Sequence, residues 1–138
     1  MKMYFLSSIV FLLALFTNPV NAQEQHEHHD YVVLTKKVQQ LKPILIAADE
    51  LAKEDGKHFG KFEIIICGQT VKELIDKEMM KDFIKKAKEQ KVDLVACGFS
   101  LNKFGVDRKD ISPELRVVEN GILYNLQLQK KGYINLSL

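Results

Sequence analysis

The stretch Val92-Asp93-Leu94-Val95-Ala96-Cys97-Gly98 decides the fold. It predicts a buried strand that ends in a cysteine and is followed at once by a turn glycine. The stretch Phe62-Glu63-Ile64-Ile65-Ile66-Cys67-Gly68 repeats this arrangement, and Cys67 and Cys97 are the two cysteines of the sequence. Ligands of open parallel α/β sheets bind at the carboxyl ends of the strands. Both thiols are therefore expected at the edge of the sheet where chemistry takes place.

Strands and helices alternate along the rest of the chain. Runs of β-branched and aromatic residues predict strands, whereas apolar residues at steps of three and four predict amphipathic helices. The expected strands are Tyr31–Thr35, Phe62–Cys67, Val92–Cys97, Leu115–Val118 and Tyr133–Leu138. Helices are expected over Val38–Gly56, Thr70–Ile75, Met80–Ala87, Ser100–Phe104 and Gly121–Lys131. Asn120 is the predicted N-cap of the last helix, and Gly132 is its predicted stop.

This alternation defines the fold class. Strands separated by helices build βαβ units, which form a parallel sheet covered by helices on both faces. The run Ile64-Ile65-Ile66 is apolar on both faces of its strand, as a central strand of such a sheet requires. The sequence therefore predicts an α/β fold with three α/β/α layers and a five-stranded, mostly parallel sheet, in a flavodoxin-like architecture.

The N-terminus has the three parts of a secretory signal peptide. Lys2 supplies a positive charge, Tyr4–Phe16 is an apolar run, and Val20-Asn21-Ala22 is a small-residue cleavage site. The apolar run is shorter than the ~20 residues that span a bilayer. We therefore expect residues 1–22 to be removed after Ala22, leaving a periplasmic or secreted protein with no membrane attachment. An uncleaved anchor is the alternative.

A polar tail separates this segment from the domain. Residues 23–30 contain no apolar side chain, which predicts a flexible tail, and residues 31–138 suffice for a single domain with one core. His26, His28 and His29 lie in the tail, and imidazoles are common zinc and copper ligands. No matching ligand cluster follows, and ordering a flexible tail costs conformational entropy. We therefore expect neither a specific metal site nor another cofactor.

Charge and motifs exclude several classes of function. Without Lys2, 19 basic residues face 18 acidic ones, whereas nucleic-acid binding needs a concentrated basic face. Nucleic acid is therefore not an expected partner. Gly68-Gln69-Thr70 opens a helix but matches no phosphate-binding loop, and no G-x-G-x-x-G fingerprint or nucleophile-elbow serine occurs. The sequence leaves open whether the protein is an enzyme.

Three roles stay open for the thiols. In the first, Cys97 is a reactive thiolate, because a helix that begins near Ser100 would aim N–H dipoles at the sulfur. Nearby basic side chains would add positive potential: Lys103, Arg108 and Lys109. In the second, Cys67 and Cys97 lie on neighbouring strands about 5 Å apart and form a disulfide or a reversible redox pair. In the third, both are buried structural thiols.

The residues after these strands carry a family resemblance, which covers Tyr31–Leu138. Its pieces are Phe62–Leu74, Val95–Leu101, Gly105-Val106, Val117–Ile122 and Leu126–Tyr133. In order and spacing they resemble the DsrE/DsrF-like family. The resemblance implies a five-stranded parallel α/β fold and self-association, often as trimers or hexamers. It also implies sulfur handling, in which a cysteine at the position of Cys97 carries a persulfide between partner proteins.

Two functions are therefore expected, from different classes. The first is an exported sulfur-carrier or thiol-redox protein that uses Cys97, with Cys67 as its redox partner and another protein as sulfur donor or acceptor. The second is a non-enzymatic oligomeric binding module with structural cysteines. Apolar residues after the third strand predict a subunit interface next to Cys97: Phe99, Leu101, Phe104 and Val106.

Overall fold

The computed structural model describes residues 28–138. Its five strands form one parallel sheet in the order β4-β3-β2-β1-β5. The strands are β1 (His29–Thr35), β2 (Phe59–Ile66), β3 (Val92–Cys97), β4 (Arg116–Val118) and β5 (Ile134–Ser137). The helices are α1 (Leu41–Asp55), α2 (Lys77–Glu89), α3 (Gly98–Lys103) and α4 (Gly121–Lys130). The predicted α/β fold is confirmed, and all of its strand pairs are parallel.

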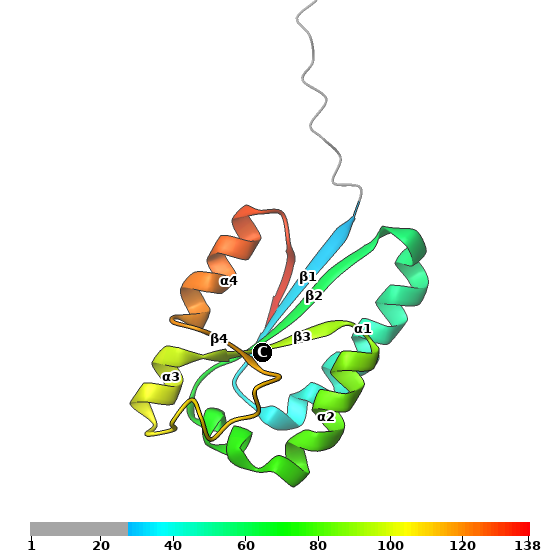
Figure 1. Ribbon diagram of the computed structural model, residues 1–138. Helices are drawn as coiled ribbons and strands as arrows, with labels where there is room; N and C mark the ends of the chain where they lie inside the picture. Colours follow the sequence, from blue (N-terminus) through cyan, green and yellow to red (C-terminus); the bar gives the residue numbers. More distant parts are fainter. Residues whose placement is uncertain (1–27) are drawn as a thin grey trace, which may run out of the picture.

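Helices cover the sheet on both faces, with α1 and α2 on one side and α4 on the other (Figure 1). The larger core lies under α1 and α2, where Leu41 and Leu45 of α1 pack on Ile64 and Ile66 of β2. The smaller core lies under α4, where Leu128 packs against strand residues that include both cysteines. The two cores make β1, β2 and β3 apolar on both faces, as expected for central parallel strands.

Short 3-10 turns complete the connections. They are η2 (Val38–Gln40), η3 (Gly56–His58) and η4 (Gln69–Ile75). Pro43 lies in the first turn of α1, where its missing N–H costs no helical hydrogen bond. Gly56 follows α1 with a φ of 55°, a backbone conformation that glycine adopts without steric cost.

Two strands begin two or three residues before the sequence-based expectation, and the other strand ends agree with it to within one residue. β1 begins at His29, so His29 and Asp30 belong to the sheet rather than to the polar tail. β2 begins at Phe59, and the β1–β2 register shifts between His29 and Tyr31. The irregularity explains the difference, because an alternation pattern does not reveal pairing across a bulge.

The helices of residues 28–138 include none that is long and apolar enough to cross a bilayer. The predicted signal peptide, its cleavage site after Ala22 and His26 lie outside the described residues.

Candidate functional site

The two cysteines meet at the carboxyl edge of the sheet. Cys97 is the last residue of β3, and Cys67 directly follows β2. Ile66 pairs with Ala96 in the parallel ladder, so the next two residues, Cys67 and Cys97, lie side by side. Both side chains face α4, are free thiols and are buried, with 4% and 2% of their surface exposed. The sequence-based expectation that the strand ends bring the thiols together is correct.

The first residue of α4 lies directly over this pair. The backbone N–H of Gly121 donates a hydrogen bond to the Cys97 sulfur at 3.3 Å. A Cβ atom at position 121 would lie 2.6 Å from Cys67 Sγ and 3.1 Å from Cys97 Cβ. Only glycine therefore lets the N-terminus of α4 approach the thiols this closely.

Ser100 supplies further donors from the other side. Hydrogen bonding by its hydroxyl and its backbone N–H lowers the pKa of the Cys97 thiol. The Ser100 hydroxyl oxygen also accepts the N–H of Gly68 at 2.8 Å, so the turn after β2 holds this side chain in place. The donors around Cys97 thus come from the segments that follow β2 and β3 and from the start of α4.

These donors determine the direction in which the pKa of the Cys97 thiol shifts. Burial is the largest single influence and raises the pKa of this thiol, but hydrogen bonds from Ser100, Gly121 and Cys67 together lower it below its ordinary value. A lowered thiol pKa is a property of reactive cysteines. Of the two thiols, Cys97 is therefore the one whose surroundings favour the thiolate form.

Cys67 has the opposite character. Burial raises the pKa of its thiol to about 12, and the adjacent Cys97 adds to the increase. Cys67 therefore stays protonated at neutral pH and donates its hydrogen bond to Cys97. The two thiols share one sheet edge but their pKa values shift in opposite directions, because the N–H of Gly121 at the start of α4 donates to Cys97.

The basic side chains expected to support Cys97 have other partners. Arg108 forms two hydrogen bonds of 2.8 Å with the Glu119 carboxylate. Lys109 pairs with Asp107 at 3.1 Å, and the Lys103 ammonium lies 5.7 Å from the Phe104 ring centroid. Backbone and hydroxyl donors, rather than cations, therefore lower the pKa of Cys97.

The structure places most of the apolar residues after β3 against their own domain. Leu101 is fully buried, and Phe104 and Val106 pack against the core of their own domain. Only Phe99 of this set is exposed, at 62%. Folding of this segment over its own sheet therefore accounts for Leu101, Phe104 and Val106, and the subunit interface stays a prediction.

Sequence reasoning located Cys97, Cys67 and the N–H of Ser100 but missed Gly121 and the Ser100 hydroxyl. Gly121 and Cys97 are 24 residues apart, and their contact depends on how the chain crosses from β4 to α4. One signal was present, because an N-cap asparagine followed by glycine marks a helix start that can approach another group closely.

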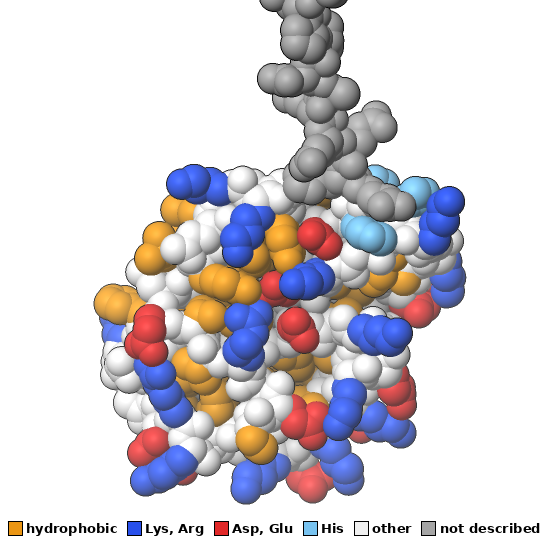
Figure 2. Space-filling model, turned by 45° about the horizontal axis from the view of Figure 1, so that its top comes forward, with side chains coloured by type: hydrophobic (Ala, Val, Ile, Leu, Met, Phe, Trp, Pro, Cys, Tyr) orange, Lys and Arg blue, Asp and Glu red, His pale blue; other side chains and the backbone are white. Residues whose placement is uncertain are grey.

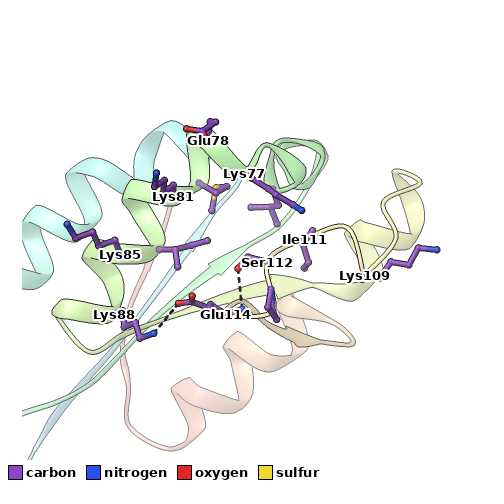
Figure 3. A pocket seen from close by; sticks show the side chains of 13 residues that line it. Lys77, Glu78, Lys81, Lys85, Lys88, Lys109, Ile111, Ser112 and Glu114 are labelled. Atoms are coloured by element: carbon purple, nitrogen blue, oxygen red, sulfur yellow. Dashed lines mark hydrogen bonds and ion pairs between the residues drawn. The ribbon is translucent and has the colours of Figure 1, made fainter.

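A hollow away from the thiols lies between α2 and the loop before β4 and has a volume of ≈ 760 Å³. Figure 3 shows Lys81, Lys85 and Lys88 along α2, with Ile111 and Ser112 facing them from the loop. Lys88 pairs with Glu114 at 3.7 Å across the hollow. Its charged side chains are all exposed, as on a solvated helix face, and it shares no residue with the thiol site.

The face shown in Figure 2 carries basic and acidic side chains interspersed, with hydrophobic ones between them. Such a mixture does not form the basic stripe that nucleic acids require. Within residues 28–138, no group of three or more His, Cys, Asp or Glu side chains is placed to hold a metal ion.

Comparison with known proteins identifies the family. The profile of the DsrE/DsrF-like family matches residues 11–136. The chain belongs to the DsrE/DsrF-like family. Sulfur-relay-like function is associated with this DsrE family as a whole, and no curated protein matches the chain.

Two solved structures share the DsrE-like fold. A protein of unknown function from Methanobacterium thermoautotrophicum has a TM-score of 0.65 at 17% identity, over 80% of this chain and 99% of that one. A conserved protein of unknown function from Bacteroides thetaiotaomicron has a TM-score of 0.59 at 20% identity, over 79% and 95% of the two chains. At these identities the likeness establishes the fold.

Proposed function

We propose that this DsrE-family protein is an exported sulfur carrier or thiol-redox protein in which Cys97 carries sulfur as a persulfide. The main support is the convergence of donors on one sulfur, from the N–H of Gly121, from Ser100 and from the thiol of Cys67. Such donors stabilise the thiolate, which is the attacking form of cysteine.

The proposed transfer uses Cys97 first as nucleophile and then as leaving group. The Cys97 thiolate attacks the outer sulfur of a donor persulfide, so a new S–S bond forms. The donor's own S–S bond breaks, and the donor leaves as a thiolate with the bonding electron pair. In delivery, an acceptor thiolate attacks the outer sulfur, and Cys97 leaves as a thiolate. A lowered pKa favours this last step, because thiols of lower pKa leave faster.

Cys67 gives the proposal a redox variant. In this variant the Cys67 thiol attacks the inner sulfur of the Cys97 persulfide, forms a Cys67–Cys97 disulfide and releases the outer sulfur as hydrogen sulfide. The side-by-side placement of the two residues supports it. The pKa of about 12 at Cys67 opposes it at neutral pH, because the attacking form is the thiolate. Carriage is therefore favoured over internal reduction.

Mass spectrometry of the mature protein tests the carrier function. After exposure to polysulfide, wild type is expected to gain one sulfur atom, and peptide mapping is expected to place it on Cys97. Cys97→Ser should gain none, whereas Cys67→Ser should still load, because a serine hydroxyl keeps a donor beside Cys97. An unmodified Cys97, in protein shown to hold a free thiol there, would rule out the carrier. A disulfide with sulfide release would identify the redox variant.

Burial favours a second candidate, a non-enzymatic oligomeric binding module with structural cysteines. Both thiols are almost fully buried, and buried free cysteine often acts as a small apolar side chain. This function predicts that Cys97→Ala leaves assembly and cellular phenotype unchanged. Loss of phenotype in a folded, assembled Cys97→Ala protein would contradict it.

The compartment and partners form part of the proposal. The mature chain begins at Gln23 in the periplasm or outside the cell, assembles as a trimer or hexamer, and exchanges sulfur with a partner protein. Intact mass of the protein isolated from its own cell envelope tests the export step. A chain that retains residues 1–22 and stays with the cytoplasmic fraction would refute it.

A further inference from the structure

One buried acid on the α4 side of the sheet has no role in the proposed transfer. Glu63 of β2 is only 3% exposed. Its carboxylate accepts hydrogen bonds from Arg116 Nη2 at 2.6 Å and from the Tyr124 hydroxyl at 2.8 Å. Burying a carboxylate is costly unless it is paired and hydrogen-bonded. Three polar side chains therefore occupy a place where apolar side chains would be sufficient for packing.

This cluster joins the sheet to the helix that covers the thiols. Glu63 lies on β2, Arg116 on β4 and Tyr124 on α4. Three interactions hold Tyr124. Its hydroxyl donates to Glu63 and accepts a hydrogen bond from Arg116 Nη2 at 3.1 Å, and its ring lies 5.1 Å from the Arg116 guanidinium carbon. Such a tyrosine has little freedom to slide along the sheet.

Helix α4 and strand β2 also reach the thiol site. Gly121, whose N–H bonds the Cys97 sulfur, lies three residues before Tyr124 and therefore on the same face of α4. Glu63 and Cys67 are four residues apart, so they lie on the same face of β2. Within one rigid turn of helix, the position of Tyr124 therefore fixes the position of the Gly121 N–H.

We propose that Glu63, Arg116 and Tyr124 are positioning residues that hold the first turn of α4 against Cys97. The proposal rests on the proposed function in one respect, because it takes Cys97 as the working thiol. These three residues form the anchor of α4. Without the anchor, α4 keeps its apolar packing through Leu128, but its first N–H no longer has a fixed distance from the Cys97 sulfur.

The test compares two matched tyrosine variants. Tyr124→Phe removes the hydroxyl on α4 that donates to the Glu63 carboxylate at 2.8 Å. Tyr31→Phe removes the hydroxyl on β1 that donates to the Asp55 carboxylate of α1 at 2.7 Å. The measurement is the pH dependence of Cys97 alkylation by iodoacetamide, with the two cysteine peptides resolved by mass spectrometry. Tyr124→Phe is expected to raise the pH midpoint of Cys97 alkylation by about half a pH unit or more. This shift corresponds to roughly a threefold loss of thiolate below the midpoint. Tyr31→Phe is expected to leave the midpoint unchanged.

A change that only destabilises α4 should lower the melting temperature without shifting the midpoint of Cys97 alkylation. Leu128→Ala loosens the packing of α4 without touching the anchor, so it should lower the melting temperature and leave the Cys97 midpoint in place. A folded Tyr124→Phe protein with the wild-type midpoint would overturn the proposal. If Tyr124→Phe does not fold, Arg116→Gln takes its place, because Arg116 is partly exposed. An unchanged midpoint in that variant is equally decisive.

Persulfide loading, measured in parallel on wild type, separates the two proposals. Loading of Cys97 without a midpoint shift in the anchor variants would remove the positioning role alone. A midpoint shift without loading would remove the carrier function and leave the anchor as the element that places α4 over the thiol.

Discussion

At the scale of single residues, two adjacent thiols differ because donors reach only one of them. Cys97 receives N–H groups from Gly121 and Ser100, and the pKa of its thiol falls below the ordinary value. Cys67 receives none, and burial raises its thiol pKa to about 12. Identical side chains thus acquire different pKa values from their burial and from the hydrogen-bond donors around them.

Gly121 makes this geometry possible, so Gly121→Ala is expected to disturb it. The added Cβ would lie 2.6 Å from Cys67 Sγ and 2.9 Å from Ile65 Cγ2. Overpacking of this kind costs about 1–3 kcal/mol, and moving α4 outward would also raise the pKa of Cys97. Urea unfolding and the pH profile of alkylation measure the two effects.

The control for this variant is Gln127→Ala at an exposed position of the same helix, which should stay within about 0.5 kcal/mol of wild type. A Gly121→Ala protein more stable than wild type would contradict the prediction. That result would mean that the higher helix propensity of alanine outweighs the steric conflict.

The raised pKa of Cys67 predicts a pH dependence of stability. A thiol whose pKa is higher in the folded state contributes stability below its unfolded pKa of about 8.5. This contribution is lost as the pH rises from there toward about 12. Cys97, with a lowered pKa, has the opposite effect: its contribution is lost as the pH falls through its folded pKa.

The variant Cys67→Ser isolates the Cys67 effect, because serine does not ionise in this range. The free energy of unfolding is measured for both proteins at pH 7, 8.5 and 10. The stability of the variant relative to wild type should increase as the pH rises. Groups that do not contact Cys67 titrate equally in both proteins and cancel in the comparison, and the serine hydroxyl keeps a donor beside Cys97. A constant difference across this range would show that Cys67 does not ionise on unfolding as described.

At the scale of elements, the N-terminus of α4 is the part that reaches the thiols. The Asn120 side chain caps it by accepting the N–H groups of Ile122 and Leu123 at 3.0 and 3.1 Å. Asp76 caps α2 in the same way, by accepting the N–H of Met79 at 3.0 Å. Since α2 lies on the other face of the sheet (Figure 1), the two caps form a matched pair.

Removing each cap should therefore separate stability from site chemistry. Asn120→Ala and Asp76→Ala are each expected to cost about 1 kcal/mol, the usual value of an N-cap. Only Asn120→Ala should also raise the pKa of Cys97, because the first N–H of α4 donates to that sulfur and α2 lies on the other face of the sheet. Denaturant unfolding and the alkylation profile give the two readouts, and equal profiles in both variants would refute the link between cap and thiol.

The elements also show how far the sequence alone could reach. Apolar runs located the strands, and the Asn120-Gly121 pair located the start of α4, because these signals are local. The approach of Gly121 to Cys97 and the bond from Tyr124 to Glu63 join residues 24 and 61 positions apart. No local pattern encodes such contacts, since they depend on how helices lie across the finished sheet.

At the scale of the whole molecule, α4 is apolar on more than one side. Gly121 and Leu128 are buried against the sheet, yet Ile122, Leu123 and Leu126 are 61%, 53% and 52% exposed. An exposed apolar patch of this kind often marks a surface that contacts another protein. This outer face of α4 therefore supports the proposed self-association better than the loop after β3 does.

Self-association through α4 predicts a charge-sensitive assembly. Leu126→Asp should dissociate the oligomer to monomers at micromolar concentration, because a carboxylate buried in an interface loses its hydration. Ile75→Asp is the matched control, since Ile75 is similarly exposed at 50% but lies at the end of η4. Sedimentation velocity should find wild type and Ile75→Asp as oligomers and Leu126→Asp as a monomer. A monomeric wild type would contradict self-association, and an oligomeric, folded Leu126→Asp would place the interface away from α4.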